Sequence, residues 1–96
     1  MADTFIEFEL RGWRFWKTKF GVHLAGFKPD LKLRWSSPIA HVVGRQVYTE
    51  SGNCYKLIGD PLDYTDAMVL SLLFACGEPI EDATLETIAR YSVQLS

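Results

Sequence analysis

Hydrophobic and polar residues alternate along most of residues 4–59. In the segment LKLRW (residues 31–35), the two leucines and the tryptophan share one parity and the two cations share the other. Such a period of two is typical of β-strands that bury one face. Further strands are predicted at residues 4–10, 13–20, 22–27, 46–50 and 54–58, and residues 39–43 form a short apolar stretch. We therefore expect a curved antiparallel sheet of about six strands over residues 4–59.

Turn-forming residues set the expected ends of these strands. Gly12 is expected to interrupt the first strand, and a bulge near Phe15 and Trp16 would explain why neighbouring aromatic residues carry opposite parity. Pro38 is expected to end the strand before it, because proline cannot donate to a central hydrogen-bond ladder. The segment SGN (residues 51–53) lies between two strand patterns and predicts a β-hairpin.

The pattern changes to a helical period in the last part of the chain. A helix is predicted over residues 64–76, with Asp63 or Thr65 as its N-terminal cap and Gly77 at its C-terminal end. This helix is apolar almost all round, so we expect it to be mostly buried, against the sheet or against a partner. A second helix is predicted over residues 82–92. Its narrow inner stripe is expected to consist of Leu85, Ile88 and Ala89.

These elements indicate one α+β domain over residues 1–96. The chain has 96 residues, of which 48% are hydrophobic, so it can bury a core without a metal ion or disulfide bonds. Its net charge is −2, but the charges are distributed unevenly. Residues 1–60 contain nine Lys or Arg and six acidic residues, whereas residues 61–96 contain Arg90 and six acidic residues. We expect a dipolar molecule with a basic sheet end and an acidic helical end.

The basic strands are the first candidate for a binding surface, because their cations alternate with aromatic residues. Cations and aromatic rings on a sheet can hold the backbone and the bases of a single-stranded nucleic acid. The slightly negative net charge favours a protein partner over a nucleic acid. Trp16 is expected at an exposed rim of this surface. The candidate residues of the basic face are Arg14, Trp16, Lys17, Lys32 and Arg34.

The acidic helical end is the second candidate for a binding surface. If the partner is a complex that handles nucleic acids, these carboxylates would compete for a basic groove that normally binds phosphate. The apolar helix over residues 66–76 is a further candidate interface, through which two copies would form a homodimer. The candidate residues of the acidic end are Asp63, Asp66, Glu78, Glu81, Asp82 and Glu86.

The sequence contains no recognisable catalytic or metal-binding motif. Ser36 and Ser37 precede His41 but lack a G-x-S-x-G frame, so we interpret these serines as partners for backbone groups at a strand corner. The soft metal ligands of the chain are His23, His41, Cys54 and Cys76. They are not paired at zinc-ligand spacing, so no metal or other cofactor is expected, and the cysteines are interpreted as buried apolar residues. We therefore expect a protein that is not an enzyme.

The sequence also shows no targeting or membrane pattern. The segment MADTFIEFEL (residues 1–10) lacks the basic and apolar regions of a signal peptide. The longest apolar run covers residues 67–76, which is about half of the ~20 residues that a membrane-spanning helix needs. We expect a cytoplasmic protein with reduced thiols and no membrane partner.

Several short motifs follow one another in the order of a known family. The motifs are LRGW (residues 10–13), GVHLAGF (21–27), WSSPI (35–39), TESGNCYKLIG (49–59) and FACGEP (74–79). Over residues 8–79 this order resembles the SANTA domain, a small module of eukaryotic centromere-licensing proteins. The family usually has an aromatic residue where this chain has Glu78. The resemblance implies a non-enzymatic interaction module and carries over no catalytic residue.

We therefore expect a small interaction protein that docks on a macromolecular partner, with another protein as the first choice. In length and style the chain is also similar to accessory proteins of phages and mobile elements. Some of those proteins inhibit bacterial defence nuclease complexes, as anti-CRISPR proteins do. The remaining alternative is a nucleic-acid-binding β module that uses the basic and aromatic residues of the segment 11–35.

Overall fold

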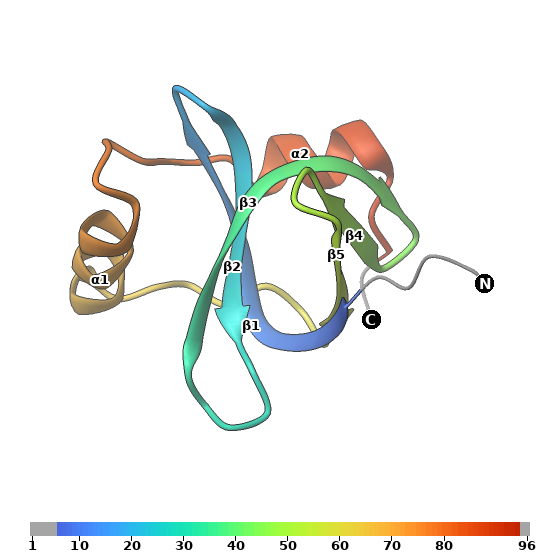
Figure 1. Ribbon diagram of the computed structural model, residues 1–96, viewed down its shortest axis with the longest axis horizontal. Helices are drawn as coiled ribbons and strands as arrows, with labels where there is room; N and C mark the ends of the chain where they lie inside the picture. Colours follow the sequence, from blue (N-terminus) through green and yellow to red (C-terminus); the bar gives the residue numbers. More distant parts are fainter. Residues whose placement is uncertain (1–5, 95–96) are drawn as a thin grey trace.

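The computed structural model describes residues 6–94, which form one mixed β-sheet and two helices (Figure 1). The elements are, in chain order, β1 (Ile6–Thr18), β2 (Gly21–Phe27), β3 (Leu33–Val43), β4 (Gln46–Thr49), β5 (Asn53–Ile58), α1 (Asp66–Cys76), β6 (Glu81–Asp82) and α2 (Thr84–Tyr91). The predicted α+β fold with six strands and two C-terminal helices is confirmed. The first two residues of the strand predicted over residues 4–10 lie outside the described residues.

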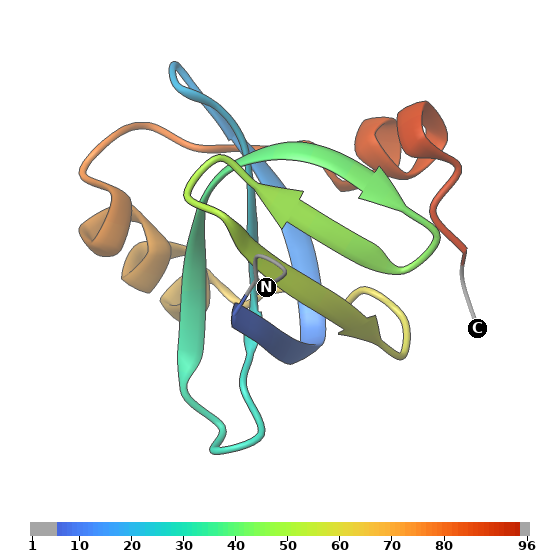
Figure 2. The ribbon, with the colours of Figure 1, turned by 45° about the vertical axis from the view of Figure 1, so that its right-hand side comes forward.

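The sheet curls until its strands pair in a closed ring (Figure 2). β1 pairs with β5 through residues 6–11 and with β2 through residues 11–18, and β3 and β4 complete the ring. The β1–β5 pair is parallel, so the sheet is mixed and not wholly antiparallel as predicted. The sixth strand, β6, follows α1 and pairs with the end of β1, beyond the predicted span of the sheet. Alternation of residues shows which face of a strand is buried but not which strand lies beside it.

β1 changes its pairing partner near Gly12, where the strand bends. Gly12 has a φ of +55°, and the ladder between β1 and β2 shifts between Arg11 and Arg14. The interruption expected at Gly12 is therefore an irregularity inside one continuous strand, and it replaces the bulge that was predicted near Phe15 and Trp16. These two aromatic residues pack in different apolar clusters, and both are buried.

β3 also continues where the sequence predicts an end. Pro38 lies inside β3 opposite His23, next to a shift in the β2–β3 ladder. At this shift the Leu24 N–H donates to Ser36 Oγ at 2.8 Å, so a hydroxyl takes the place of a backbone acceptor. Proline is tolerated here because the ladder is already irregular. The prediction that Pro38 ends its strand is wrong, whereas the role predicted for the serines is confirmed for Ser36.

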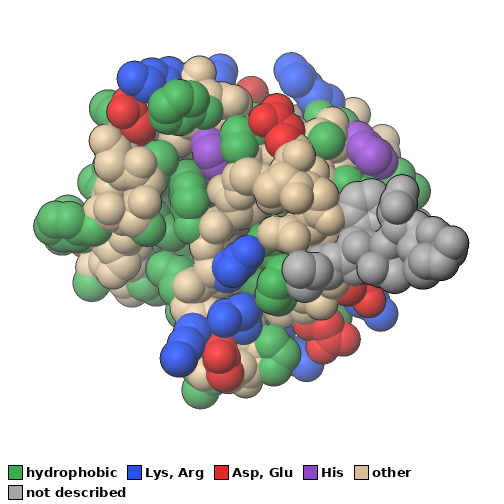
Figure 3. All heavy atoms as spheres, in the orientation of Figure 1, with side chains coloured by type: hydrophobic (Ala, Val, Ile, Leu, Met, Phe, Trp, Pro, Cys, Tyr) green, Lys and Arg blue, Asp and Glu red, His purple; other side chains and the backbone are tan. Residues whose placement is uncertain are grey.

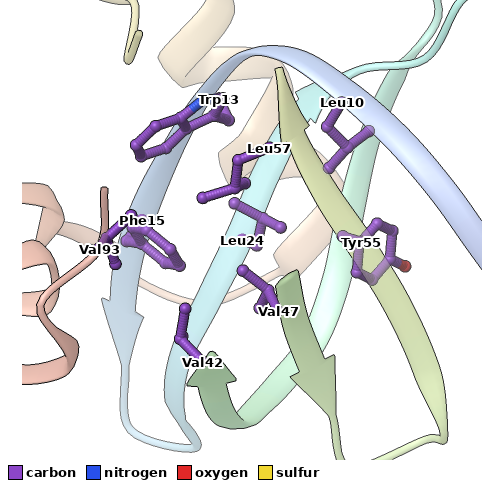
Figure 4. Packing of buried hydrophobic residues seen from close by; sticks show 9 residues of the cluster. All are labelled: Leu10, Trp13, Phe15, Leu24, Val42, Val47, Tyr55, Leu57 and Val93. Carbon is purple, nitrogen blue, oxygen red and sulfur yellow. The ribbon is translucent and has the colours of Figure 1, made fainter. Parts of the chain in front are cut away.

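The apolar side chains form two clusters, one inside the curled sheet and one between the sheet and α1. The buried residues of the first cluster point toward one another from several strands (Figure 4) and are Leu10, Trp13, Phe15, Leu24, Val42, Val47, Tyr55, Leu57 and Val93. In the second cluster, Trp16 and Ala25 pack against Leu72 of α1. Burial of a large apolar side chain contributes about 1.5–3 kcal/mol, so both clusters stabilise the closed sheet.

α1 begins and ends where the sequence predicts, but its burial differs. The Thr65 hydroxyl accepts a hydrogen bond from the Met68 N–H at 3.3 Å, and Gly77 follows the helix with a φ of +74°. Leu72 is the one residue of α1 that is buried. The sheet therefore buries only one side of α1, which rules out the first of the two predicted ways of burying this helix, and burial against a partner remains a prediction. Neither helix within residues 6–94 has the length and apolarity that crossing a membrane requires.

Two predictions of buried apolar residues are wrong for local reasons. In α2 the Thr84 hydroxyl bonds to the backbone of Phe15, which turns Leu85 and Ala89 of the predicted inner stripe toward solvent. Leu31, predicted to face the core, lies in the turn before β3 with a φ of +68° and is 80% exposed.

Candidate functional site

α1 stands at one side of the sheet (Figure 1) and is attached through its inner side and the segment before it. The Tyr64 hydroxyl donates to the Gly12 carbonyl oxygen at 2.8 Å, and its ring lies 5.7 Å from the Trp16 ring. Burial raises the pKa of the Tyr64 hydroxyl, so this group remains a proton donor. Together with Leu72, these contacts fix the inner side of α1 to the sheet.

The opposite side of α1 is an exposed apolar surface. The exposed residues that recur at helical spacing are Ala67, Leu70, Ser71, Phe74 and Ala75, which together we call the α1 face. Leu70 is 55% exposed and Phe74 is 87% exposed. No charged residue occurs between Asp66 and Glu78. Figure 3 shows hydrophobic side chains projecting over α1, and contiguous apolar patches of this kind mark interaction sites.

A shallow hollow continues the α1 face at the C-terminal end of the helix. It has a volume of about 450 Å³ and is lined by Leu70, Leu73, Phe74, Gly77, Glu78 and Pro79. We call it the α1 hollow. Its walls are apolar except for the Glu78 carboxylate. Glu78 Oε1 lies 3.4 Å from Lys19 Nζ. The α1 hollow can therefore receive an apolar group next to an acidic side chain.

The residues of the predicted basic face do not form one patch. Lys17 lies near the β1–β2 turn, whereas Lys32 and Arg34 lie at the opposite end of β2. The Arg34 guanidinium lies 4.7 Å from the centre of the Phe8 ring, and its Nε donates to the Tyr55 hydroxyl at 3.0 Å. Arg34 thus packs on two aromatic residues of the first apolar cluster and is only partly available to a partner.

Trp16 does not lie at an exposed rim, which corrects the prediction. It is 6% exposed and packs beneath α1 against Tyr64 and Leu72. Its indole Nε1 is buried without a hydrogen-bond partner among the described residues. A ring in this position cannot stack on a base of a nucleic acid.

Arg14 joins the predicted basic face to the predicted acidic end. Its Nε lies 2.6 Å from Asp82 Oδ2, and one terminal nitrogen lies 3.3 Å from Asp63 Oδ1. Partial burial alone would raise the pKa of Asp82, but hydrogen bonds from Thr84 and Arg14 outweigh it, and the pKa is lowered. The two predicted surfaces therefore meet and partly neutralise each other at this point.

The remaining acidic candidates are spread over several elements. Asp66 lies in the first turn of α1, where the helix dipole favours a negative charge. Glu78 lies at the α1 hollow, and Glu81 lies on β6 opposite Lys17. Glu86 lies on α2 beside a small cavity of about 80 Å³ that Lys17 also lines. Of these acids, Asp66 and Glu78 flank the α1 face.

The histidine beside Ser36 is His23, not His41. His23 Nδ1 lies 3.0 Å from the Ser36 carbonyl oxygen, which can only accept, so this nitrogen carries a proton. His23 Nε2 lies 2.8 Å from Thr18 Oγ1, and Ser36 Oγ donates to the Ser37 carbonyl oxygen at 2.7 Å. His41 is exposed on β3. The polar groups around Ser36 are therefore paired with one another and hold the strands together.

The potential metal ligands are also dispersed. No three metal-ligating side chains come together within residues 6–94. Cys54 and Cys76 are free thiols, and Cys54 is buried as predicted while Cys76 is half-buried. Burial raises the pKa of the Cys54 thiol, and the charge of Glu7 adds to this effect. Cys54 is therefore poorly suited to form a thiolate.

Comparison with known proteins found no match, neither among protein families nor among curated proteins or solved structures. The candidate site is therefore identified from its exposure and chemistry. The sequence indicated the α1 face only through the apolar character of the helix, which equally predicts burial. It gave no signal for the exposed Leu31, since the alternation of residues 31–35 assigns this side chain to the core.

Proposed function

We propose that this chain is a non-enzymatic interaction protein that binds a protein partner through the α1 face. The observation that carries the proposal is the exposure of Phe74, which is 87% accessible in a stretch without charge. A polar residue at this position would leave the packing of Leu72 on the sheet unchanged. Folding therefore does not require Phe74, whereas an interface would use it.

The charges around the α1 face favour a protein over a nucleic acid or a lipid surface. Asp66 and Glu78 flank the face, and Lys19 partly neutralises Glu78. Asp66 would repel the phosphates of nucleic acids and of anionic lipids. Protein interfaces, in contrast, combine an apolar centre with a polar rim, which is the arrangement around Phe74. The dispersed basic residues and the buried Trp16 also make the nucleic-acid alternative the weaker one.

The energetics indicate that the partner covers more than two side chains. Burial of Leu70 and Phe74 would contribute about 1.5–3 kcal/mol each. Association costs about 4–15 kcal/mol of lost freedom, so these two residues cannot sustain a complex alone. We expect the partner to cover the α1 face and to place an apolar group in the α1 hollow.

A module of the SANTA type, which the motifs of residues 8–79 resemble, would act through the same class of function. An inhibitor of a bacterial defence complex would also act by docking on a protein. The two hypotheses therefore differ in the identity of the partner and share the binding step that we propose.

Site-specific photo-crosslinking tests the proposal. A photoreactive phenylalanine analogue is placed at position 74 and, as a control, at position 85 on α2, where Leu85 is 79% exposed. In the native host we expect one protein to crosslink from position 74 and none from position 85. With that protein purified, Phe74→Gln should weaken binding about tenfold or more, whereas Leu85→Gln should bind as the wild type does.

The same assay separates the alternatives. Binding that is unchanged in Phe74→Gln but lost when Lys32 and Arg34 are reversed to Glu would refute the α1 face and support the basic face. Loss of binding only on neutralisation of the acids Asp63, Asp66 and Glu78 would assign the site to the acidic end. Circular dichroism of each variant shows whether its fold is intact.

A further inference from the structure

The indole N–H of Trp16 is a buried donor without an acceptor. Trp16 is 6% exposed, and its Nε1 has no hydrogen-bond partner among the described residues. The burial of an unpaired donor costs free energy, so such a group calls for a physical explanation in a folded protein. The indole of Trp13 shows the ordinary arrangement, since its Nε1 donates to the Gly59 carbonyl oxygen at 3.0 Å.

The cover over Trp16 comes from α1 and from the residues next to this helix. In the second cluster Trp16 packs against Leu72 of α1, and Tyr64, Val69 and Ile80 pack against the same cluster. If this cover were lifted, water would reach the indole and accept its N–H. The unpaired donor therefore acts against the closed position of α1 and favours a state in which the helix has left the sheet.

The segments before and after α1 are fixed to the sheet independently of the helix. Before α1, the Leu62 N–H donates to the Trp13 carbonyl oxygen at 3.3 Å. After α1, β6 pairs with β1, and the Ala83 N–H donates to the Phe15 carbonyl oxygen at 2.9 Å. Residues 63–80 thus leave the sheet at one fixed point and return to it at another, with α1 at the side of the molecule (Figure 1). The pairing of the strands does not depend on α1.

Among the described residues, few interactions hold residues 63–80 against the sheet. The Tyr64 hydroxyl donates to the Gly12 carbonyl oxygen at 2.8 Å, and Leu72 supplies the buried apolar contact. Two ion pairs also reach this segment, but each includes an exposed side chain and contributes little. The second cluster has three buried residues, whereas the first cluster has nine. The attachment of α1 is therefore expected to open at a lower free energy than the closed sheet.

We propose that residues 63–80 open away from the sheet as one unit while the closed sheet and α2 stay folded. This inference goes beyond the proposed function, because the opening belongs to the free chain and needs no partner. It also changes what a partner can reach. In the open state Leu72 and the Trp16 indole become accessible together with the α1 face, so a partner can surround a helix that is apolar all round. Elements that bind or move are commonly those that open most easily.

Native-state hydrogen exchange of the full chain, followed by mass spectrometry at increasing urea concentrations, measures this opening. Peptides from residues 66–76 should exchange through a partial opening that depends only weakly on urea. Peptides from β1 and β5 should exchange through global unfolding, about tenfold or more slowly in the absence of urea. Exchange of α1 in step with β1 and β5 at every urea concentration would overturn the proposal.

Replacement of Trp16 by benzothienylalanine tests the role of the unpaired N–H. This analogue has nearly the shape of tryptophan, but a sulfur atom takes the place of the N–H group, so the packing is kept and the donor is lost. The opening of α1 should then become about tenfold rarer, and its exchange correspondingly slower. The matched control is the same replacement of Trp13, which removes the hydrogen bond to Gly59 and should not slow the exchange of α1. Simple fraying of the helix would leave its exchange unchanged by the analogue at position 16, and unchanged or faster exchange there would overturn the proposal.

Discussion

Replacement of Ser36 by alanine should destabilise the protein by about 1–3 kcal/mol, because it leaves a buried backbone N–H without an acceptor. Ser36 is 2% exposed, and its Oγ accepts the Leu24 N–H at 2.8 Å while donating to the Ser37 carbonyl oxygen at 2.7 Å. The ladder between β2 and β3 is irregular here, so the Leu24 N–H depends on this hydroxyl. Water does not reach a group buried to this degree, and the alanine methyl cannot accept a hydrogen bond.

Urea unfolding followed by the fluorescence of the three tryptophans measures this loss. Ser37→Ala is the matched control, since Ser37 Oγ lies near the surface, where it pairs with Ser51 Oγ at 2.9 Å and accepts the Ser51 N–H at 3.3 Å. Water can replace these bonds, so its removal should cost within about 0.5 kcal/mol. The dependence of the unfolding free energy on urea should be equal in both variants. If Ser36→Ala lowers the free energy of unfolding no more than Ser37→Ala, the hydroxyl does not replace a ladder acceptor and the reasoning is refuted.

Further predictions address other parts of the fold. Gly12→Ala should lower the free energy of unfolding by about 1–2 kcal/mol through its left-handed backbone, and by more if the side chains of Leu62 and Phe27 cannot move. A Cβ atom at Gly12 would lie 3.2 Å from each of these side chains. If Gly12→Ala has the same urea midpoint as the wild type, the position does not require glycine. Because hydrogen bonds lower the pKa of Asp82, its stabilising effect is complete above the ordinary pKa of an aspartate and is lost as the pH falls below about 4. Between about pH 7 and pH 3, the free energy of unfolding should therefore fall less in Asp82→Asn than in the wild type. An equal fall in both proteins would exclude this role for Asp82. Cys54 should react slowly with iodoacetamide at about pH 8 in the native protein and rapidly in urea, because burial raises its pKa and blocks access. Peptide mapping that finds fast native labelling of Cys54 would contradict this expectation. On α1, Leu72→Ala should lower the free energy of unfolding by about 2–5 kcal/mol, whereas Phe74→Gln should change it within about 0.5 kcal/mol. A large thermal destabilisation by Phe74→Gln would show that the Phe74 side chain supports the fold.

Features that depend on residues close in the sequence were predictable. Residues 50–52 form the turn of the predicted hairpin between β4 and β5, and Thr65 and Gly77 bound α1 as expected. Each of these signals acts within a few residues, through turn geometry or through a cap. The type of most elements therefore followed from the pattern of residues, whereas β6 and the continuity of β1 and β3 did not.

Features that depend on distant partners were not predictable. Alternation cannot reveal that the first half of β1 pairs in parallel with β5, because the same pattern suits either direction. The irregularity near Gly12 changes the phase of β1, so Trp16 lies beneath α1 and not at an exposed rim. For α1, an apolar composition predicts burial, but only the tertiary arrangement shows that the sheet covers one side of this helix.

Several charged residues of the two predicted surfaces pair with one another, so they are less available to a partner than the sequence suggests. Arg14 binds Asp63 and Asp82, and Lys19 binds Glu78, so these cations of β1 and the β1–β2 turn tie down the acidic segment that follows β5. Exposed ion pairs of this kind contribute only about 0–1 kcal/mol each, but they reduce the dipole that would steer a highly charged partner.

What remains uncompensated on the surface is apolar. The α1 face and Leu31 expose large side chains that the fold does not need. Asp66 and the Lys19–Glu78 ion pair lie beside the α1 face. In such an arrangement the apolar groups supply the affinity, while the flanking charges set orientation and the rate of encounter. Substitution of Phe74 should therefore change the dissociation rate of a complex, whereas Asp66→Asn should change mainly the association rate and its dependence on salt.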